Sequence, residues 1–207
     1  MPVDQRTHWN SVYSNDSNYF GNGPSAFGTG CAARMLSENV KRVLELGPGQ
    51  GRDTGYFVSR HMFVVAADYS ERSCRDVKDK YFDAVSVLHT DLKDGIHIDE
   101  DSVDACYSHM LFTMDFKDSE ALQLMKDISR AVRKDGPIFL SVRSKNDPLY
   151  GKGEHVEGDI WENNGFAVRF YSEDDLRNLF SDCEFENIAE FKEDDKVLYG
   201  VLIRNRK

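Results

Sequence analysis

The chain has 207 residues, of which 40% are hydrophobic, a length that supports one sizeable core and leaves no room for a separate catalytic domain. Its 36 acidic against 26 basic residues give a formal net charge of -10. This charge argues against nucleic acid as a partner, because that binding depends on cationic contacts. No stretch approaches the roughly 20 apolar residues that span a bilayer, and no signal-peptide pattern is present. We therefore expect a cytoplasmic protein without a membrane partner.

The cysteines are Cys31, Cys74, Cys106 and Cys183, and they lie far apart in the sequence. None of them forms a C-x-x-C pair, so their spacing favours neither a zinc site nor a disulfide framework. We expect scattered, buried thiols in a reducing compartment.

The first 39 residues fit no sheet element. They contain the aromatic residues Trp9, Tyr13, Tyr19 and Phe20 and a Gly-Asn-Gly-Pro turn at residues 21–24. This composition predicts helical pieces and a loop ahead of the first strand.

From residue 40 onward, short apolar runs alternate with amphipathic segments, which is the pattern of a parallel sheet covered by helices on both faces. The predicted strands span residues 42–46, 62–67, 84–89, 103–108 and 137–142. The clearest helix is predicted at 119–134, where apolar residues recur at helical spacing until Gly136 and Pro137 end it. Shorter helices are predicted at about 53–60 and 70–80.

The C-terminal part changes character after residue 170. Ser172 begins a Ser-x-x-Asp capping signature for a helix that ends near Phe180. Residues 184–191 and 197–204 are predicted as strands, and the short polar turn between them implies an antiparallel pair. The last strand is apolar throughout, so we expect it inside a mixed, seven-stranded sheet. Residues 144–170, rich in Gly, Asp, Glu and Asn, are predicted as a long connection, either a lid, a binding loop or a disordered segment.

A glycine-rich loop, Gly47-Pro48-Gly49-Gln50-Gly51, follows the first strand. Three glycines in five positions let the backbone turn tightly and approach a ligand where a Cβ would collide. The next helix points its N-terminus at the same place. A glycine cluster alone is a weak signal, but its position between a strand and a helix favours an adenosine-type cofactor.

Acids follow the second and third strands as well. Asp68 lies 19 residues beyond Gly49, at the distance where a carboxylate grips the two ribose hydroxyls. A helix N-cap is the alternative for Asp68, but Ser70 can serve as that cap and would leave the acid free. Asp91 ends the third strand, where an ordinary solvated aspartate is the alternative.

At these residues the sequence resembles the class I S-adenosylmethionine-dependent methyltransferases along nearly its whole length. VLELGPGQG at 43–51 matches the first family motif, an acid followed by G-x-G-x-G, whereas nicotinamide sites more usually have G-x-G-x-x-G. VVAADYS at 64–70 is similar to the second motif, and VDACYSHM at 103–110 to the fourth-strand motif. The resemblance implies that the protein binds S-adenosylmethionine and leaves S-adenosylhomocysteine as product. The residues implied to bind the cofactor are Glu45, Gly47, Gly49, Gly51, Asp68 and Tyr69 of the first two motifs, Asp91 and the backbone of Leu92 at the adenine, and His109 near the methionine part.

The expected fold is thus an α/β, Rossmann-like, doubly wound, seven-stranded mixed sheet with a C-terminal antiparallel strand pair and helices on both faces. It forms one structural domain, with residues 1–39 as an N-terminal helical lid segment and 40–207 as the class I methyltransferase domain.

Further features look most like the tellurite-resistance and thiopurine-type small-molecule methyltransferases. They are Gly51-Arg52-Asp53, the N-terminal segment 8–27, and Arg143 followed by the segment 147–153. This resemblance implies a substrate and lid role for Trp9, Tyr13, Tyr19 and Tyr150. A hydrophobic staple of an ordinary helix explains Trp9 and Tyr13 equally well.

Methyl transfer is an in-line displacement for which positioning in a water-poor pocket is the main requirement, and a general base is optional. If a base exists, His109 is the candidate, and a structural histidine that contacts only the cofactor is the alternative. Arg143 either orients an anionic acceptor or pairs with one of the many acids. Possible metal ligands alternate along a polar segment at His155, Glu157 and Asp159. In such a segment these side chains are more often solvent-exposed than bound to a metal, so no metal is predicted.

We therefore expect a methyltransferase with a small-molecule acceptor, acting as a monomer or a homodimer. A protein methyltransferase, a nicotinamide-dependent oxidoreductase and a non-catalytic cofactor-binding protein remain open. Against an oxidoreductase, the chain lacks the usual glycine spacing and a tyrosine-lysine pair. Against a nucleic-acid methyltransferase, it lacks an Asn/Asp-Pro-Pro-aromatic motif.

Overall fold

The computed structural model describes residues 4–21 and 23–207, so the turn predicted at 21–24 lies partly outside the described residues. Its α-helices are α1 (Gln5–Asn15), α2 (Ala26–Ser37), α3 (Arg52–Ser59), α4 (Glu71–Tyr81), α5 (Asp118–Ala131) and α6 (Glu173–Leu179). Three short 3-10 turns are η1 (Phe82–Ala84), η2 (Leu92–Asp94) and η3 (Leu111–Thr113). In this part of the chain no helix is long and apolar enough to cross a bilayer.

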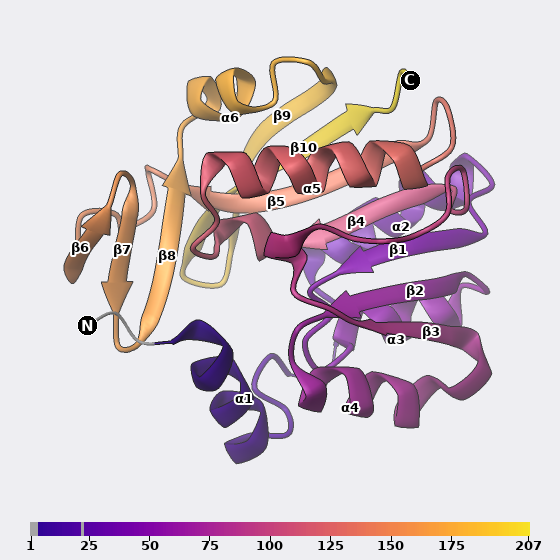
Figure 1. Cartoon of the computed structure of the whole chain (residues 1–207), viewed down its shortest axis with the longest axis horizontal. Helices are drawn as coiled ribbons and strands as arrows, with labels where there is room; N and C mark the ends of the chain where they lie inside the picture. Colours follow the sequence, from indigo (N-terminus) through magenta and orange to yellow (C-terminus); the bar gives the residue numbers. More distant parts are fainter. Residues whose placement is uncertain (1–3, 22) are drawn as a thin grey trace.

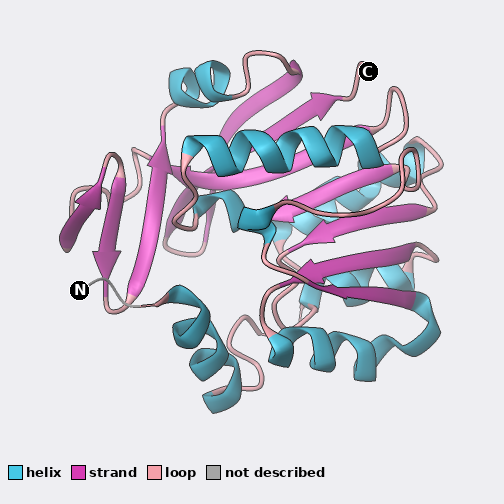
Figure 2. Ribbon diagram, in the orientation of Figure 1, coloured by secondary structure: helices cyan, strands magenta, loops and turns pink. Residues whose placement is uncertain are grey.

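The described strands form one mixed sheet (Figures 1 and 2). They are β1 (Arg42–Leu46), β2 (Phe63–Asp68), β3 (Val85–His89), β4 (Ala105–His109), β5 (Pro137–Ser144), β6 (Glu154–Glu157), β7 (Ile160–Asn163), β8 (Phe166–Tyr171), β9 (Glu184–Glu193) and β10 (Lys196–Arg204). The order β3-β2-β1-β4-β5 is parallel, and β10 and β9 continue it as an antiparallel pair. These seven strands confirm the predicted sheet, and β10 is interior to it.

The prediction of a strandless connection at 144–170 was wrong. This segment contains β6, β7 and the start of β8, joined by antiparallel pairing. β8 pairs with the end of β5, where Arg143 lies opposite Phe170. Because Arg143 also pairs with Leu198 of β10, β8 must lie on the other edge of β5, beyond the carboxyl end of β4. The extra strands therefore stand above the edge of the sheet where ligands bind in α/β folds.

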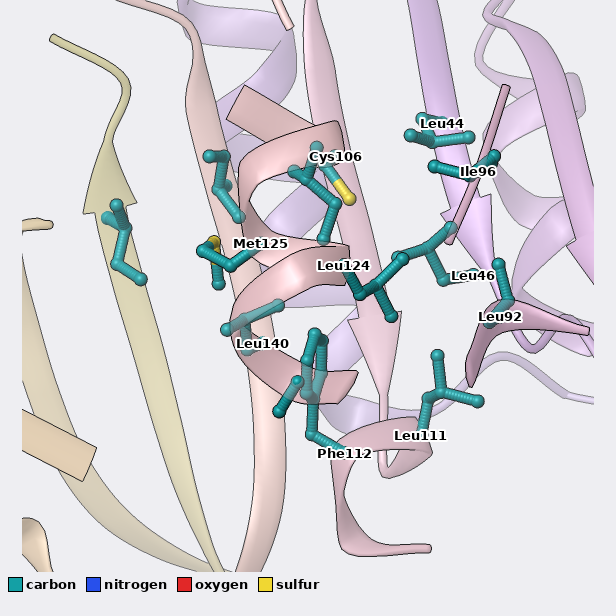
Figure 3. Close-up of a cluster of buried hydrophobic side chains, with 14 of the residues drawn as sticks. Leu44, Leu46, Leu92, Ile96, Cys106, Leu111, Phe112, Leu124, Met125 and Leu140 are labelled. Atoms are coloured by element: carbon teal, nitrogen blue, oxygen red, sulfur yellow. The ribbon is translucent and has the colours of Figure 1, made fainter. Parts of the chain in front are cut away.

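Strand alternation divides the core between the two faces of the sheet. In β1, Leu44 and Leu46 face α5 and its Leu124 and Ile128 (Figure 3), whereas Val43 packs with the α2, α3 and α4 layer on the opposite face. Each face buries an apolar helix surface, which is why helices cover the parallel strands on both sides.

All four cysteines are free thiols. Cys31, Cys74 and Cys106 are buried, and Cys183 is partly exposed. The expectation of scattered, mostly buried thiols is confirmed.

Candidate cofactor and acceptor site

The glycine-rich loop leaves the carboxyl end of β1 in a conformation that requires glycine. Gly47, Gly49 and Gly51 all have positive φ, at 67°, 55° and 81°. The amide of Gly47 donates to the carbonyl of Ala67 at 2.9 Å, which ties the loop to the end of β2. A Cβ at Gly49 would lie 3.1 Å from the hydroxyl of Tyr13. The loop is therefore a tight cradle directly beneath the N-terminal segment.

Glu45 precedes this loop on β1 and is buried at 2% exposure. Its carboxyl accepts a hydrogen bond from the hydroxyl of Thr54 at 2.6 Å. Burial raises the pKa of Glu45 to about 8, and the nearby carboxylates of Asp53 and Asp68 act in the same direction. A buried acid without a cationic partner at the mouth of a glycine loop suits a ligand that brings positive charge.

Asp68 ends β2 and is also buried. Ser70 is the N-cap of α4, as predicted, but Asp68 is not left free. Its oxygens accept from the amide of Ser70 at 2.8 Å, the hydroxyl of Ser73 at 2.8 Å and the amide of Gly49 at 3.4 Å. Burial raises the pKa of Asp68. The acid is thus held rigidly between the glycine loop and α4, and a ligand must compete for or share its remaining lone pairs.

A cavity of about 650 Å³ opens at the carboxyl ends of β1, β2, β4 and β5. The structure brings ten of the predicted site residues to its wall: Trp9, Tyr13, Tyr19, Glu45, Gly47, Gly49, Asp68, Tyr69, His109 and Arg143. They come from segments 134 residues apart in sequence, and the parallel sheet gathers them at one edge.

Four predicted site residues do not line this cavity: Gly51, Asp91, Leu92 and Tyr150. Gly51 is the N-cap of α3. The carboxylate of Asp91 caps η2 and forms an ion pair with Arg6 of α1 at 2.6 Å, while Leu92 is buried in the core. The hydroxyl of Tyr150 donates to Asp159 at 2.8 Å, and its neighbour Leu149 lines the cavity instead.

Helix α1 lies between the β7/β8 strands and α4 (Figure 1), and its residues Trp9 and Tyr13 line the cavity. On one side Asn10 accepts from the hydroxyl of Ser70 at 2.6 Å, and on the other the side-chain amide of Gln5 donates to the carbonyl of Gly165 at 2.9 Å. Trp9 packs between them, with its ring 5.1 Å from that of Phe166 and 5.4 Å from that of Tyr13. The N-terminal aromatics therefore form the roof of the cavity.

His109 ends β4 and is held by two partners. Its Nδ1 lies 2.6 Å from the hydroxyl of Ser141, and its Nε2 lies 3.1 Å from the carboxylate of Glu193. Glu193 also forms an ion pair with Arg52 at 3.2 Å. Burial is the largest single influence and works to raise the pKa of Glu193, but the interactions with His109, the amide of Phe27 and the charge of Arg52 together outweigh it and lower the pKa to about 2. Both ring nitrogens lie within hydrogen-bond distance of a protein group, which fixes the orientation of the His109 ring.

Arg143 ends β5 and is buried in the wall at 6% exposure. Its Nη2 donates to the carboxylate of Asp147 at 2.6 Å, which fits the ion pair that the sequence left open. Its Nε is buried without a hydrogen-bond partner. His155, Glu157 and Asp159 show no metal site: among the described residues no group of three or more His, Cys, Asp or Glu side chains is arranged to hold a metal.

Sequence reasoning missed the wall formed by β7 and β8. Trp161, Asn163, Phe166, Val168 and Phe170 line the cavity. A signal was present, because Asn164-Gly165 is a favoured hairpin turn. Both residues have positive φ, 51° and 86°. Glu193 was missed as well, since nothing local marks a hairpin residue that reaches the first half of the chain.

Residues 43–136 match a family described as a methyltransferase domain. The matched segment, a little under half of the chain, supports a methyltransferase enzyme. Its cofactor is accordingly S-adenosylmethionine. A comparison with curated proteins gives no match.

Solved structures share the fold of this methyltransferase at low sequence identity. The 1,6-didemethyltoxoflavin-N1-methyltransferase of Burkholderia thailandensis has a TM-score of 0.74 at 16% identity, over 98% of this chain and 88% of that one. The N-methyltransferase NodS of Bradyrhizobium japonicum, solved with S-adenosylhomocysteine, has a TM-score of 0.72 at 10% identity, over 99% and 100%. A Clostridium acetobutylicum S-adenosylmethionine-dependent methyltransferase has a TM-score of 0.71 at 11% identity, over 99% and 100%. The overall fold is that of class I methyltransferases.

The residues present in this methyltransferase fit the cofactor. The glycine cradle admits backbone contact, and the carboxylate of Asp68 lies behind it. The buried acid Glu45 lacks a positive partner, and S-adenosylmethionine carries an ammonium and a sulfonium charge.

Proposed function

We propose that the protein transfers a methyl group from S-adenosylmethionine to a small-molecule acceptor bound in the same cavity. One observation carries the proposal: the glycine loop and the β7/β8 wall share a single cavity that α1 covers. A cavity of about 650 Å³ lies in the usual range for small-ligand sites, about 300–1,000 Å³.

The cofactor end of the proposed site consists of Glu45, the loop at Gly47 and Gly49, Asp68 and Tyr69. When bound, S-adenosylmethionine supplies a methyl group on a sulfonium, which an acceptor atom takes by in-line displacement. Asp68 would hold the ribose hydroxyls, and Glu45 would face the positive charge. Asp91 and Leu92 stay predictions for the adenine, which would require Arg6 to share Asp91 with the ligand.

The chain's own contribution is to orient the acceptor and to exclude water. The roof formed by residues 4–21, with Trp9, Tyr13 and Tyr19 on the cavity wall, would act as the lid. His109 is held by Ser141 and Glu193, so we assign it a positioning role. It follows that the acceptor atom is nucleophilic without a base, as a thiolate or an unprotonated amine is.

A small acceptor is also supported by the Burkholderia enzyme of the same fold, which was solved with 1,6-didemethyltoxoflavin and S-adenosylhomocysteine bound. The tellurite-resistance and thiopurine-type sub-family is the finer assignment that we propose, on the N-terminal and Arg143 motifs. A protein acceptor is less favoured because α1 closes the cavity toward bulky substrates.

Two measurements test the proposal. Calorimetry of the intact protein should show binding of S-adenosylmethionine and S-adenosylhomocysteine, and NADH should not bind. Incubation with radiolabelled S-adenosylmethionine and a cell lysate, followed by dialysis, should leave the label in the small-molecule fraction. Label retained on proteins would favour a protein methyltransferase, and cofactor binding without any transfer would favour a non-catalytic binding protein.

A further inference from the structure

One wall of the cavity is a flat aromatic surface made by β7 and β8. Residues two apart in a strand point to the same side, so Phe166, Val168 and Phe170 share one face of β8. In the antiparallel register Trp161 lies opposite Val168, and Asn163 lies opposite Phe166. All five residues line the cavity. Such a face favours a planar, apolar ligand group.

A buried cation stands at the end of this wall. Arg143 pairs in register with Phe170, and its guanidinium carbon lies 5.6 Å from the centre of that ring. A guanidinium offers five N–H donors. Of these nitrogens, Nη2 donates to Asp147, Nε is buried without a partner, and Nη1 makes no hydrogen bond to the described residues. Buried donors of a charged group are rarely left unused.

Asp147 does not account for this surplus of donors. Its carboxylate is fully buried and already accepts from Arg143 at 2.6 Å, the amide of Leu149 at 2.9 Å and the amide of Val197 at 2.8 Å. The two backbone contacts fix the carboxylate, and the carboxylate in turn fixes one corner of the guanidinium. Nε has no accessible surface, so Nη1 is the donor that is held in place for another acceptor.

The other charged side chains at this end are of both signs, and the charge of Arg143 contributes to the lowered pKa of Asp195. Lys152 lines the cavity at an exposed position and forms no ion pair with the described residues. Glu193 is engaged by His109 and Arg52. Asp194 and Asp195 line the exposed rim, and Asp195 pairs with Lys196 at 2.8 Å. The part of the cavity formed by the β7/β8 wall is thus aromatic, with the cation Arg143 beside Phe170.

We propose that the acceptor is a small aromatic carboxylate that also bears the thiolate or amine to be methylated. Its ring packs on the β7/β8 wall, its carboxylate is bound by Arg143, and its thiolate or amine takes the methyl group as the sulfur–methyl bond of the cofactor breaks. The inference rests on the proposed function and names its substrate class. The carboxylate is the anchor that orients the ring relative to the cofactor end of the cavity, and Lys152 at the rim attracts the anion on entry.

The test uses the intact protein saturated with S-adenosylhomocysteine and three probes: benzoate, benzamide and cyclohexanecarboxylate. Benzamide keeps the ring without the charge, and cyclohexanecarboxylate keeps the charge without the flat ring. We expect benzoate to bind at least about tenfold more tightly than either, as measured by calorimetry.

The variant Arg143→Lys keeps a positive charge beside Asp147 but removes the fork of donors. It should weaken benzoate binding at least about tenfold and leave S-adenosylhomocysteine affinity unchanged. Arg169→Lys is the matched control. Arg169 follows Val168 on the opposite face of β8, lies 4.8 Å from the ring centre of Tyr171 and pairs with Asp118. This control should leave benzoate binding unchanged.

Three results would overturn the inference: benzoate no tighter than benzamide or cyclohexanecarboxylate, no benzoate binding at all in the presence of bound S-adenosylhomocysteine, or equal effects of the two arginine variants. If Arg143→Lys no longer binds S-adenosylhomocysteine, the three-probe comparison on the unaltered protein decides. Failure of the unaltered protein to bind S-adenosylhomocysteine would instead contradict the proposed function.

Discussion

The carboxylate of Glu193 lies 3.1 Å from Nε2 of His109, although 84 residues separate them in sequence. His109 is the last residue of β4, and Glu193 is the last residue of β9, which among the described strands pairs only with β10. The ring of Phe27 stacks on His109 at 5.5 Å, and its amide donates to Glu193 at 3.3 Å. The C-terminal hairpin thus completes the cavity wall that the parallel strands begin.

This contact predicts that Glu193→Gln is less stable than the unaltered protein at neutral pH and that the difference disappears toward pH 2. The pKa of Glu193 is lowered to about 2 from an ordinary 4.5, so its carboxylate stabilises the fold above about pH 4.5 and loses that effect as pH falls toward 2. Each pKa unit corresponds to about 1.4 kcal/mol, so the variant should lose on the order of 3 kcal/mol at neutral pH. Denaturant unfolding at several pH values measures this.

The exposed strand residue Glu157 provides the control, since Glu157→Gln should not change the unfolding free energy by more than about 0.5 kcal/mol. If Glu193→Gln and the unaltered protein have the same unfolding free energy from pH 2 to 7, the contact does not stabilise the fold.

Glu45 should make cofactor binding depend on pH. Its pKa is raised to about 8 from 4.5, chiefly by burial, so the free protein holds a proton there at neutral pH. That proton stabilises the fold below about pH 4.5, and its contribution is lost as pH rises through 8. Binding of a cationic ligand favours the carboxylate, so S-adenosylmethionine should bind more tightly from pH 6.5 to 8.5 and release a proton.

Calorimetry in buffers of different ionisation enthalpy counts the protons released. Glu45→Gln should release none, bind more weakly at pH 8.5 and lose the decline in unfolding free energy between about pH 4.5 and 8. Equal proton release by Glu45→Gln and the unaltered protein would place the titrating group elsewhere.

Asp68→Asn should reduce affinity for S-adenosylhomocysteine at least about tenfold, because an amide cannot accept both ribose hydroxyl protons. The amide of Ser70 still finds an acceptor oxygen, so the melting temperature should fall by only a few degrees. Asp76 forms a partly exposed helical pair with Arg72 on α4, and Asp76→Asn is the control that should bind normally. Calorimetry and thermal unfolding separate the two effects, and equal affinities in the two variants would exclude Asp68 from the cofactor site.

Gly49→Ala should impair cofactor binding more than its backbone strain explains. Gly49 has φ of 55°, and its Cβ would meet Tyr13, whereas Gly158 has φ of 50° and open space around it. Both alanine variants should lose roughly 1–2 kcal/mol of stability from the left-handed conformation. Only Gly49→Ala should also weaken S-adenosylhomocysteine binding, and a comparable loss in Gly158→Ala would mean that the loop is not the cradle.

Local signals predicted much of the sheet. The strand at 42–46 was predicted at its observed bounds, and Ser172 caps α6 with Asp175 in the expected reciprocal pair. These features depend on neighbouring residues, so the sequence around them is sufficient. The acid Asp68 was placed correctly at the end of β2, but its three hydrogen bonds to Gly49, Ser70 and Ser73 depend on how the loop and α4 pack.

The acceptor end was not predictable in the same way. All four residues of β6 are exposed, and the four residues of β7 are buried or partly buried, so neither strand shows a clear alternation of apolar and polar residues. β8 pairs with β5 at only two positions, a contact that arises because β4 ends early and leaves that edge of β5 open. The contact of Glu193 with His109 is likewise a product of strand order, which no short motif encodes.

The most direct test of the central claim is methyl transfer itself. Purified protein, radiolabelled S-adenosylmethionine and a protein-free extract of small metabolites should yield a labelled product that passes a dialysis membrane, and the yield should fall in Asp68→Asn. No labelled product from extracts that contain aromatic acids, from a protein that binds S-adenosylhomocysteine normally, would contradict the claim of a small-molecule methyltransferase.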